Sequence, residues 1–425
     1  MNHFETRDGG LACEDVDLTA VAEAVGTPVY VYSSATLERH YAGWRTALDR
    51  RREALGEAMV AFAVKACPNL SVLATLARLG CGADTVSEGE IRRALKAGVP
   101  PPRIVFSGVG KTDAELAFAL EVGVLQINVE APPEMDRLAS IAQAKGLTAS
   151  VAIRVNPGVG AGGHAKITTG GAADKFGVPG EVALELYARA ARTPGLRPVG
   201  LACHIGSQIS DLEPLRRAFI VLRGLVERLR SDGLGIERVD VGGGLGVPYF
   251  DQPDPPSPDD YAAMLAGVFG GLGVEIACEP GRAIVANAGV LLARVIHVHA
   301  RPDRRLLVVD AGMNDLLRPA LYDAFHDIRP VRPRAGAEVL AYDVVGPVCE
   351  SSDVFARGRE LARLEAGDLV AFMSAGAYGA AMASEYNSRP LAPEVLVRGA
   401  EWRVVRRRPS WEEMLAREAG ALGEA

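Results

Sequence analysis

The sequence predicts an α/β fold made of a (β/α)8 barrel of the TIM type and a separate C-terminal β-sandwich or β-barrel domain. Between about residues 36 and 284, short β-rich runs alternate with longer helical patterns, and eight strand–helix units of this kind are typical of a barrel. Beyond this region the helical patterns give way to short strands separated by turns. Most of the barrel runs end in a polar residue, as expected where barrels carry their chemistry.

The predicted barrel strands are short and rich in apolar or β-branched residues, with amphipathic patterns between them. The strands span residues 58–64, 82–86, 103–107, 124–129, 150–155, 199–204, 238–242 and 274–278. The helical patterns span residues 70–79, 88–97, 113–122, 133–145, 182–191 and 212–231.

The second domain is expected to be β-rich and discontinuous, because an N-terminal strand at 27–32 can join it. Its other predicted strands span 290–299, 305–309, 338–344, 368–372, 394–398 and 402–406. The barrel is therefore assigned to 36–284, and the β-rich domain to 1–35 and 285–425. Residues 250–260, with four prolines, are predicted to form a loop, and residues 411–422 a surface helix.

The composition is typical of a soluble globular protein: of 425 residues, 48% are hydrophobic and 23% charged, with a net charge of -7. No basic stripe favours nucleic-acid binding, and we expect a small-molecule substrate. The sequence has no signal-peptide pattern and no apolar run of the roughly 20 residues that a membrane span needs, so we expect a cytoplasmic protein without a membrane partner. Six cysteines occur singly, without the paired spacing of structural zinc, and no metal is expected.

Lys65 is the strongest candidate for a catalytic residue. It follows the apolar run 59–64, and the chain has only six lysines among 46 basic residues. Burial lowers the pKa of an ammonium from about 10.4 in model peptides, which yields a nucleophilic amine suited to forming a Schiff base. A strand-end lysine that reaches solvent is the alternative.

The polar strand ends are expected to converge on one face of the barrel, because parallel strands all end on the same side. The residues concerned are Lys65, Asp84, Ser107, Asn128, Arg154, His204 and Glu279, with the glycines at 242–244.

The glycine run after the seventh strand does not fit a dinucleotide-binding motif. The third glycine of G-x-G-x-x-G is replaced by Val247 or Tyr249, and a proline-rich loop stands where the helix should begin. A turn that presents backbone N–H groups to a single phosphate fits better. A tight structural turn is the alternative.

Two further motifs follow the sixth and eighth strands. The glycine and serine in H-I-G-S-Q would let His204 face a flat cofactor while Ser207 reaches its phosphate, although a core histidine is the alternative. In E-P-G-R, a buried Glu279 needs a cationic partner, which either Arg282 or a protonated ring nitrogen could supply. An ordinary Glu–Arg ion pair is the simpler interpretation of that motif.

A lysine, a phosphate turn, a ring-facing histidine and a strand-end carboxylate together indicate pyridoxal 5'-phosphate (PLP). The motifs V-K-A-C-P-N, G-A-D-T-V-S-E-G-E, H-I-G-S-Q, G-G-G-L-G, E-P-G-R, G-P-V-C-E-S-S-D and A-G-A-Y-G occur in this order, and the chain resembles the barrel-type PLP-dependent decarboxylases over about residues 25–400. Within that family it is similar to the subgroup that acts on meso-diaminopimelate. The family commonly has K-A-N-P-N after the lysine, whereas this chain has Cys67.

The resemblance implies roles for individual residues. Lys65, His204 and Cys349 would be catalytic, as the cofactor-bound amine, the ring-stacking imidazole and the proton donor. The cofactor would be held by Lys65, Asp84, His204, Ser207, Gly243, Gly244, Glu279, Pro280, Gly281, Arg282 and Tyr378. The substrate would be bound by Arg282, Arg318, Tyr322, Glu350 and Tyr378. The family also places the cysteine at a dimer interface, which implies a homodimer with shared active sites.

The charges of the residues implied by the resemblance indicate the substrate, although a dimer-interface salt bridge for Glu350 and a solvated surface position for Arg318 are the alternatives. A carboxylate such as Glu350 can pair with a distal ammonium, while Arg282, Arg318 and Tyr322 can bind a distal carboxylate. meso-Diaminopimelate carries both groups at its far end, whereas ornithine and lysine carry only the amine. Decarboxylation to L-lysine and CO2 in lysine biosynthesis is therefore expected.

Other functions stay open. The substrate could instead be ornithine, D-lysine or a carrier-linked amino acid, and the chain could be a catalytically silent regulatory homologue or an alanine-racemase-like enzyme. The glycine-containing segment 164–177 also resembles the diaminopimelate subgroup and is expected to be either a mobile lid or a static loop.

Overall fold

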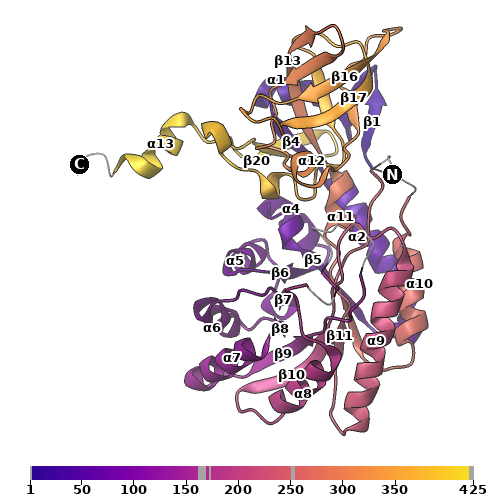
Figure 1. Cartoon of the computed structure of the whole chain (residues 1–425), viewed down its shortest axis with the longest axis vertical. Coiled ribbons are helices and arrows are strands. Elements are labelled where there is room, and N and C mark those ends of the chain that lie inside the picture. Colours follow the sequence, from indigo (N-terminus) through magenta and orange to yellow (C-terminus); the bar gives the residue numbers. More distant parts are fainter. Residues whose placement is uncertain (1, 161–168, 172–173, 250–253, 421–425) are drawn as a thin grey trace. The chain divides into compact units, whose positions relative to one another are not determined.

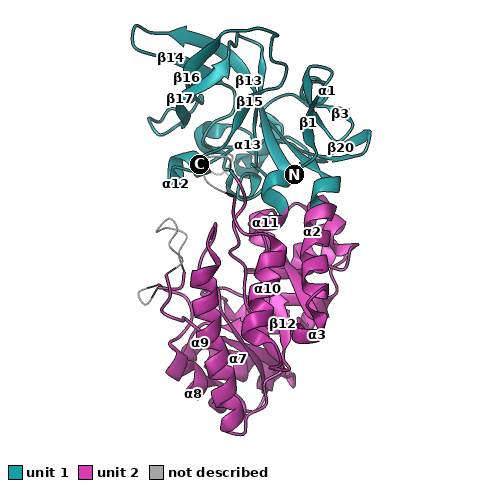
Figure 2. Cartoon of the chain, turned by 90° about the vertical axis from the view of Figure 1, so that its right-hand side faces the viewer, with its two compact units in different colours: residues 1–37, 249–252, 285–425 teal, residues 38–248, 253–284 magenta. Residues whose placement is uncertain are grey.

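The computed structural model describes residues 2–160, 169–171, 174–249 and 254–420, and it divides into two compact units. One unit comprises residues 38–248 and 253–284, and the other residues 1–37, 249–252 and 285–425 (Figure 2). The first is the α/β unit and the second is the β-rich unit. Tyr249 is thus grouped with the β-rich unit, although it lies within the chain segment of the barrel.

Among the described residues of the α/β unit, eight parallel strands close into a barrel in the order β10-β11-β12-β5-β6-β7-β8-β9. The predicted barrel fold is therefore confirmed. The strands are β5 (Ala58–Ala63), β6 (Gly82–Thr85), β7 (Ile104–Phe106), β8 (Gln126–Val129), β9 (Ala149–Arg154), β10 (Leu196–Ala202), β11 (Arg238–Asp240) and β12 (Glu275–Cys278). Closure comes from the parallel pairing of β12 with β5, in which Ile276 lies opposite Ala58.

Helices surround the barrel strands (Figure 1). They are α2 (Ser34–Asp49), α3 (Arg52–Leu55), α4 (Leu70–Ala77), α5 (Glu88–Lys96), α6 (Asp113–Val122), α7 (Pro132–Lys145), α8 (Gly180–Ala190), α9 (Leu212–Ser231), α10 (Pro258–Phe269) and α11 (Arg282–Val285). Their ends follow local rules: α6 begins with a capping box between Thr112 and Glu115 and ends at Gly123, whose φ of 76° is the left-handed conformation that glycine adopts easily.

The amphipathic pattern of α9 shows how a barrel helix is held. Leu215, Phe219, Leu222 and Val226 recur at helical spacing and are buried. The ring of Phe219 lies 6.3 Å from that of Tyr261 in α10. Aromatic pairs at such centroid separations stabilise packing beyond the area that they bury. The outer helices are therefore fixed to one another as well as to the strands.

The β-rich unit is built on a mixed nine-stranded sheet within the described part of the chain. Its main path is β17-β16-β14-β13-β4-β19-β20, and β18 pairs with both β13 and β15. The strands are β4 (Val29–Ser33), β13 (Gly289–Ala300), β14 (Arg305–Val309), β15 (Ile328–Pro330), β16 (Val339–Val345), β17 (Val354–Ala362), β18 (Leu369–Phe372), β19 (Glu394–Arg398) and β20 (Glu401–Arg406). A small sheet of β1 (Phe4–Arg7), β2 (Gly10–Cys13) and β3 (Val16–Asp17) and the helices α1 (Leu18–Val25), α12 (Arg318–Tyr322) and α13 (Trp411–Ala419) complete the unit.

β4 is the N-terminal strand that was predicted to join the β-rich domain, and it lies between β13 and β19 in the sheet. It pairs antiparallel with β13 and parallel with β19. Val29 and Val31 of β4 pack with Val290, Leu292 and Val395 in one buried cluster. An N-terminal segment therefore closes a sheet whose other strands come from the last third of the chain.

Some elements were missed by the sequence pattern. β17 contains Arg357, Gly358, Arg359 and Glu360, which obscure the apolar alternation of a strand, and it forms only because it pairs along most of β16. β11 ends at Asp240, so the glycines at 242–244 lie beyond the strand rather than partly inside it. The predicted tail helix ends at Ala419, short of the expected 422.

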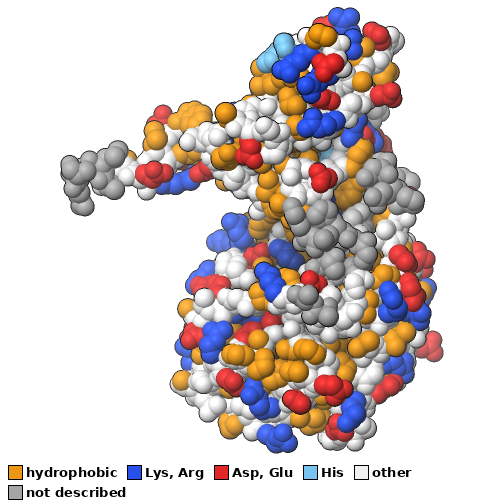
Figure 3. All heavy atoms as spheres, viewed as in Figure 1, with side chains coloured by type: hydrophobic (Ala, Val, Ile, Leu, Met, Phe, Trp, Pro, Cys, Tyr) orange, Lys and Arg blue, Asp and Glu red, His pale blue; other side chains and the backbone are white. Residues whose placement is uncertain are grey.

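Charged side chains of both signs are interspersed on the face shown in Figure 3. Exposed ion pairs of the chain include Arg197 with Glu237 and Arg223 with Glu227. Of the helices that the structure describes, none is both long enough and apolar enough to cross a bilayer.

Candidate active site

A cavity of about 420 Å³ lies at the carboxyl ends of the barrel strands. Most of the wall residues lie at or just after the end of a strand, so barrel closure brings together side chains that are far apart in sequence. The polar residues that line the cavity are Lys65, Ser107, Glu115, Asn128, Arg154, Thr169, His204, Asp240 and Glu279. Three residues that the pattern of strand ends named without giving them a role, Ser107, Asn128 and Arg154, thus share one space with Lys65, His204 and Glu279.

Lys65 lies in a single 3-10 turn, η1 (Val64–Ala66), directly after β5. Its Nζ donates a hydrogen bond of 2.5 Å to Oδ2 of Asp84, and the Asp84 side chain is completely buried. About a third of the Lys65 side chain (35%) is exposed, on the cavity side of the strand. The amine is thus accessible to a ligand while Asp84 fixes its direction.

His204 follows β10 and is held in its neutral form. The backbone N–H of Gly243 donates to Nδ1 of His204 at 3.2 Å, so the ring proton of the neutral imidazole is assigned to Nε2. Burial, reinforced by the positive charges of Lys65 and Arg154, lowers the pKa of His204 well below its usual 6.5. A neutral ring in the cavity wall suits stacking against a flat cofactor.

The glycine run owes its composition to close packing. A Cβ at Gly243 would lie 2.2 Å from the carbonyl oxygen of Glu279, and Gly242 has a φ of 63° that disfavours other residues. A tight structural turn is therefore enough to explain why Gly242 and Gly243 are glycines. Phosphate binding by Gly243 and Gly244 stays a prediction.

Arg282 has a different partner from the one that the motif suggested. Its Nε and Nη2 donate to Oγ of Ser207 at 3.2 and 3.0 Å, and in the described ranges no ion pair joins it to Glu279. Two motifs that follow β10 and β12 are joined by this contact. Pro280 and Gly281 pack next to β5: the Pro280 carbonyl accepts from Ala63 N at 3.3 Å.

Glu279 and Asp84 each have a buried carboxyl oxygen without a hydrogen-bond donor in the described part of the chain, Oε1 and Oδ1 respectively. Burial raises the pKa of Glu279 well above its usual 4.5, and the nearby charges of Asp240 and Asp84 raise it further while Lys65 lowers it. A buried acceptor in such surroundings fits a positively charged N–H donor, as a protonated pyridine ring provides. The residues present therefore fit a pyridoxal group.

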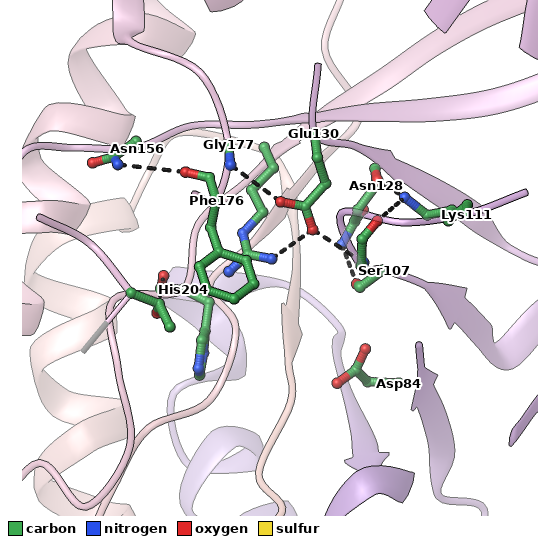
Figure 4. Close-up of polar contacts among 12 residues, drawn as sticks. Asp84, Ser107, Lys111, Asn128, Glu130, Asn156, Phe176, Gly177 and His204 are labelled. Carbon is green, nitrogen blue, oxygen red and sulfur yellow. Dashed lines mark hydrogen bonds and ion pairs between the residues drawn. The ribbon is translucent and has the colours of Figure 1, made fainter. Parts of the chain in front are cut away.

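A buried charge network below the cavity was not foreseen in the sequence. Glu130 accepts from Arg154 Nη1 at 2.7 Å, from Gly108 N at 3.0 Å and from Gly177 N at 3.1 Å (Figure 4). Because its carboxylate links residues that follow β7, β8 and β9, it holds three strand-end loops together. Arg154 is thereby fixed in the cavity wall, with its guanidinium 4.8 Å from the ring of Phe176.

Lys111 is the second buried cation of this network. Its Nζ donates to the Gly108 and Asn128 carbonyls, both at 2.7 Å, and to Oε1 of Glu134 at 2.5 Å. The other oxygen of Glu134 accepts from Glu130 N at 2.9 Å. In the sequence, only their position near polar strand ends pointed to Lys111, Glu130 and Glu134. Charged residues in a loop or early in a helix are usually solvated, so burial of these three was not expected.

The predicted substrate residues Arg318 and Tyr322 lie in α12 of the β-rich unit. Arg318 is buried, its Nη1 lies 2.8 Å from Nε2 of His326, and its guanidinium lies 4.8 Å from the ring of Tyr249. Nδ1 of His326 is 2.9 Å from the Met373 carbonyl, so Nδ1 donates and Nε2 accepts from Arg318. Arg318 is thus a positioned cation and not a solvated surface arginine.

Cys349 and Glu350 lie in an exposed loop of the same unit, between β16 and β17. The Cys349 backbone N–H donates to Oδ1 of Asn387 at 2.8 Å, and Glu350 Oε1 accepts from Ser352 Oγ at 2.7 Å. Hydrogen bonds from Ser352 and Tyr386 lower the pKa of Glu350, which is therefore ionised at neutral pH. All six cysteines lie in the described part of the chain, and of these only Cys349 is exposed.

Tyr378, in the β-rich unit, has a φ of 54°, an uncommon conformation for a residue with a side chain. Such strain is often retained where a side chain must point in a particular direction. The structure thus forms two groups of predicted residues, one around the barrel cavity and one in the β-rich unit. That they act together stays a prediction, and residues 164–168 and 172–173 of the expected lid lie outside the described residues.

A closed parallel barrel with a strand-end lysine, a neutral ring-facing histidine and a buried carboxyl acceptor defines a PLP-dependent enzyme. Residues 34–286 match the family described as "Pyridoxal-dependent decarboxylase, pyridoxal binding domain". Diaminopimelate decarboxylase from Zymomonas mobilis is 48% identical over 98% of this chain and 99% of its own length, and that from Pseudomonas aeruginosa is 48% identical over 99% of both. The crystal structure of the Helicobacter pylori enzyme complexed with L-lysine has a TM-score of 0.91 and 41% identity, covering 95% of this chain and 100% of that one.

The chain belongs to the diaminopimelate decarboxylase family of pyridoxal-dependent decarboxylases. It is a PLP-dependent lyase, and its cofactor is pyridoxal 5'-phosphate. The predictions of family and cofactor are confirmed.

Proposed function

We propose that this enzyme converts meso-2,6-diaminopimelate to L-lysine and CO2, a step of lysine biosynthesis. The observation that carries this is the near-complete coverage by relatives named diaminopimelate decarboxylase at 48% identity. A relative of the same fold also binds L-lysine, the product expected of this reaction. The decarboxylases that act on ornithine are represented by a lysine/ornithine enzyme at 24% identity, which supports the fold alone.

The barrel residues hold and orient the cofactor in this proposal. Lys65 Nζ attaches it covalently, His204 packs against its ring, and Glu279 accepts the N–H of its ring nitrogen. Ser207, Arg282 and the 243–244 turn bind its phosphate. When bound, PLP supplies an electron sink for the electron pair that departing CO2 leaves on Cα.

Cys349 is proposed to deliver a proton to Cα. It is the exposed thiol of the chain, and Asn387 fixes its backbone. General acids of this kind contribute about 10²–10⁴-fold to rate. A thiol is suited to the task because it can lose a proton at a moderate pH.

Substrate choice is proposed to follow from two opposite charges. Glu350 is ionised and can pair with the distal ammonium of meso-diaminopimelate. Arg318, with Tyr322 beside it on α12 and Arg282 from the barrel, binds the distal carboxylate. Tyr378 contacts both cofactor and substrate. A substrate that lacks either charge would leave one of these side chains without its partner.

We further propose that the active form is a homodimer in which Cys349 and Glu350 of one subunit complete the barrel site of the other. Support comes from their exposure in the single chain, although both carry chemistry that normally needs a sheltered site. As a biosynthetic enzyme whose cysteines are all free thiols, it is proposed to work in the cytoplasm.

The test is CO2 release by the holoenzyme from meso-diaminopimelate, L-lysine, D-lysine and ornithine, with and without added PLP. The expected result is release from meso-diaminopimelate much faster than from the others. Faster release from ornithine or either lysine would assign the enzyme to another substrate. Lack of release from all four, with cofactor bound, would favour a silent homologue.

A further inference from the structure

Asp240 is a buried carboxylate in the barrel that has no part in the reaction proposed above. It ends β11, is 1% exposed and lines the cavity. Oδ1 accepts from Gly242 N at 3.0 Å, and Oδ2 accepts from Asn128 Nδ2 at 3.1 Å and Gln126 Nε2 at 3.2 Å. Three N–H donors favour the charged form of a carboxyl group. Burial raises the pKa of Asp240, and these donors act against that rise.

The neighbouring carboxyl group of Glu279 is the one that carries a proton. Glu279 follows β12, which pairs with β11, its backbone N–H donates to the Gly242 carbonyl at 2.7 Å, and both carboxyl groups line the same cavity. Burial and the charge of Asp240 raise the pKa of Glu279, so one proton is retained between the two carboxyl groups. Oε1 of Glu279 receives no N–H or O–H donor among the residues described. Since the donors all favour a charged Asp240, the shared proton belongs to Glu279.

The other charges around this pair are already balanced. Asp84 is paired with Lys65, and Arg154 with Glu130. His204 is held neutral, and burial raises the pKa of the Cys203, Cys278 and Tyr261 groups, which keeps them neutral as well. In the part of the chain that is described, no cationic side chain forms an ion pair with Asp240. Its negative charge is thus left to act on Glu279 and on whatever Glu279 contacts.

We propose that Asp240 is a positioning residue whose fixed negative charge, one carboxyl group behind Glu279, keeps a proton on the ring nitrogen of the bound cofactor. This inference rests on the proposed contact between Glu279 and that nitrogen. When the ring binds, the proton of the carboxyl pair can pass to the nitrogen, which leaves Glu279 and Asp240 both negative beside one positive ring. Two anions hold the ring proton to a higher pH than Glu279 alone would.

The test uses the holoenzyme, loaded with cofactor labelled with ¹⁵N at the ring nitrogen and titrated without substrate. The nitrogen chemical shift reports ring protonation directly and does not depend on activity. Compared with the unmodified chain, Asp240→Asn is expected to lose the ring proton at a pH lower by about one unit, the effect of removing one nearby buried charge. If Asp240 contributed only to packing, Asp240→Asn would not change the pH at which the ring nitrogen loses its proton.

A second variant protects the test if Asp240→Asn fails to fold or to bind cofactor. Asn128→Leu removes a donor that favours the charged form of Asp240 but leaves both carboxyl groups in place, and it should shift the titration in the same direction by less. An unchanged titration in a loaded Asp240→Asn protein, or in Asn128→Leu if only that variant loads, would overturn the proposal.

Glu279→Gln, measured in the same way, tests the contact between Glu279 and the ring nitrogen separately from the proposed role of Asp240. A large loss of ring protonation in Glu279→Gln is expected. If Glu279→Gln leaves the ring titration unchanged, the contact on which the inference rests is wrong and the inference falls with it. Because substrate is absent throughout, the outcome is independent of which amino acid the enzyme decarboxylates.

Discussion

The backbone N–H of Gly243 donates to Nδ1 of His204, so the glycine turn after β11 sets which ring nitrogen of the histidine after β10 carries the proton, while burial keeps the ring neutral. Proton acceptance at Nδ1 would break this hydrogen bond and place a cation near Lys65 and Arg154. The ring is therefore kept neutral by its surroundings. The consequences of this and of four other arrangements can be measured.

The neutral state of His204 predicts a loss of stability in acid. The pKa of the folded ring lies well below 6.5, so the unfolded chain takes up a proton that the folded chain does not as pH falls below about 6.5. The free energy of unfolding should therefore be fully retained above about pH 6.5 and fall by up to about 1.4 kcal/mol per pH unit below it. Urea unfolding measured from neutral to mildly acidic pH tests this. His204→Phe should lessen the slope; an equal slope in both proteins would contradict the argument.

Lys65→Ala should abolish cofactor attachment and decarboxylation, because Lys65 Nζ is the amine that the cavity presents. The measurement is the visible absorbance of bound cofactor together with CO2 release. Lys145→Ala is the matched control, since Lys145 is a partly exposed lysine on α7 paired with Glu121. A Lys65→Ala protein that keeps the absorbance band would show that another lysine binds the cofactor.

Cys349→Ser should lower kcat by about 10²–10⁴-fold with a smaller effect on KM, because the thiol is proposed to act as a general acid. A thiol reagent should label one cysteine per native chain rapidly, since the other five are buried. L-Lysine should slow that labelling if Cys349 reaches the site. Labelling at an unchanged rate with saturating L-lysine would separate Cys349 from the site, and a normal kcat in Cys349→Ser would remove its assigned role.

Glu350→Gln should raise KM for meso-diaminopimelate by about tenfold or more, as expected when a hydrogen bond to a charged group is lost. The hydrogen bonds from Ser352 and Tyr386 lower the pKa of Glu350, so substrate binding should hold through neutral pH and weaken only as pH falls through that lowered value. Steady-state kinetics across pH measure both effects. Glu360→Gln, an exposed substitution on β17, is the control and should change neither.

Lys111→Met should destabilise the folded chain by about 3–5 kcal/mol, because it leaves the buried Glu134 carboxylate without its cation. Lys145→Met breaks an exposed pair with Glu121 and should cost about 0–1 kcal/mol. Chemical denaturation of the two variants compares them directly. Equal costs would mean that the buried pair contributes no more than a surface one.

The sequence predicted the barrel because its signals are local. Strands such as β5 show an apolar run, and helices such as α9 show a 3.6-residue pattern or, like α6 with its Thr112–Glu115 box, a cap. β17 was missed for the opposite reason: its charged residues carry no strand pattern, and its partner β16 supplies the hydrogen bonds. The bounds of β11 were too long because glycines after a strand resemble its continuation.

The sequence by itself determined which kinds of chemistry are available: one strand-end lysine, one ring-facing histidine, a carboxylate after β12, and motifs that resemble one family. Only the tertiary structure decided the partners of those groups. Arg282 binds Ser207 instead of Glu279, Asp84 holds Lys65, and Asp240 shares one cavity with Glu279. The physical reason is that these contacts join different strands of a closed barrel, so they depend on the strand order and register, and neither is encoded in any single segment.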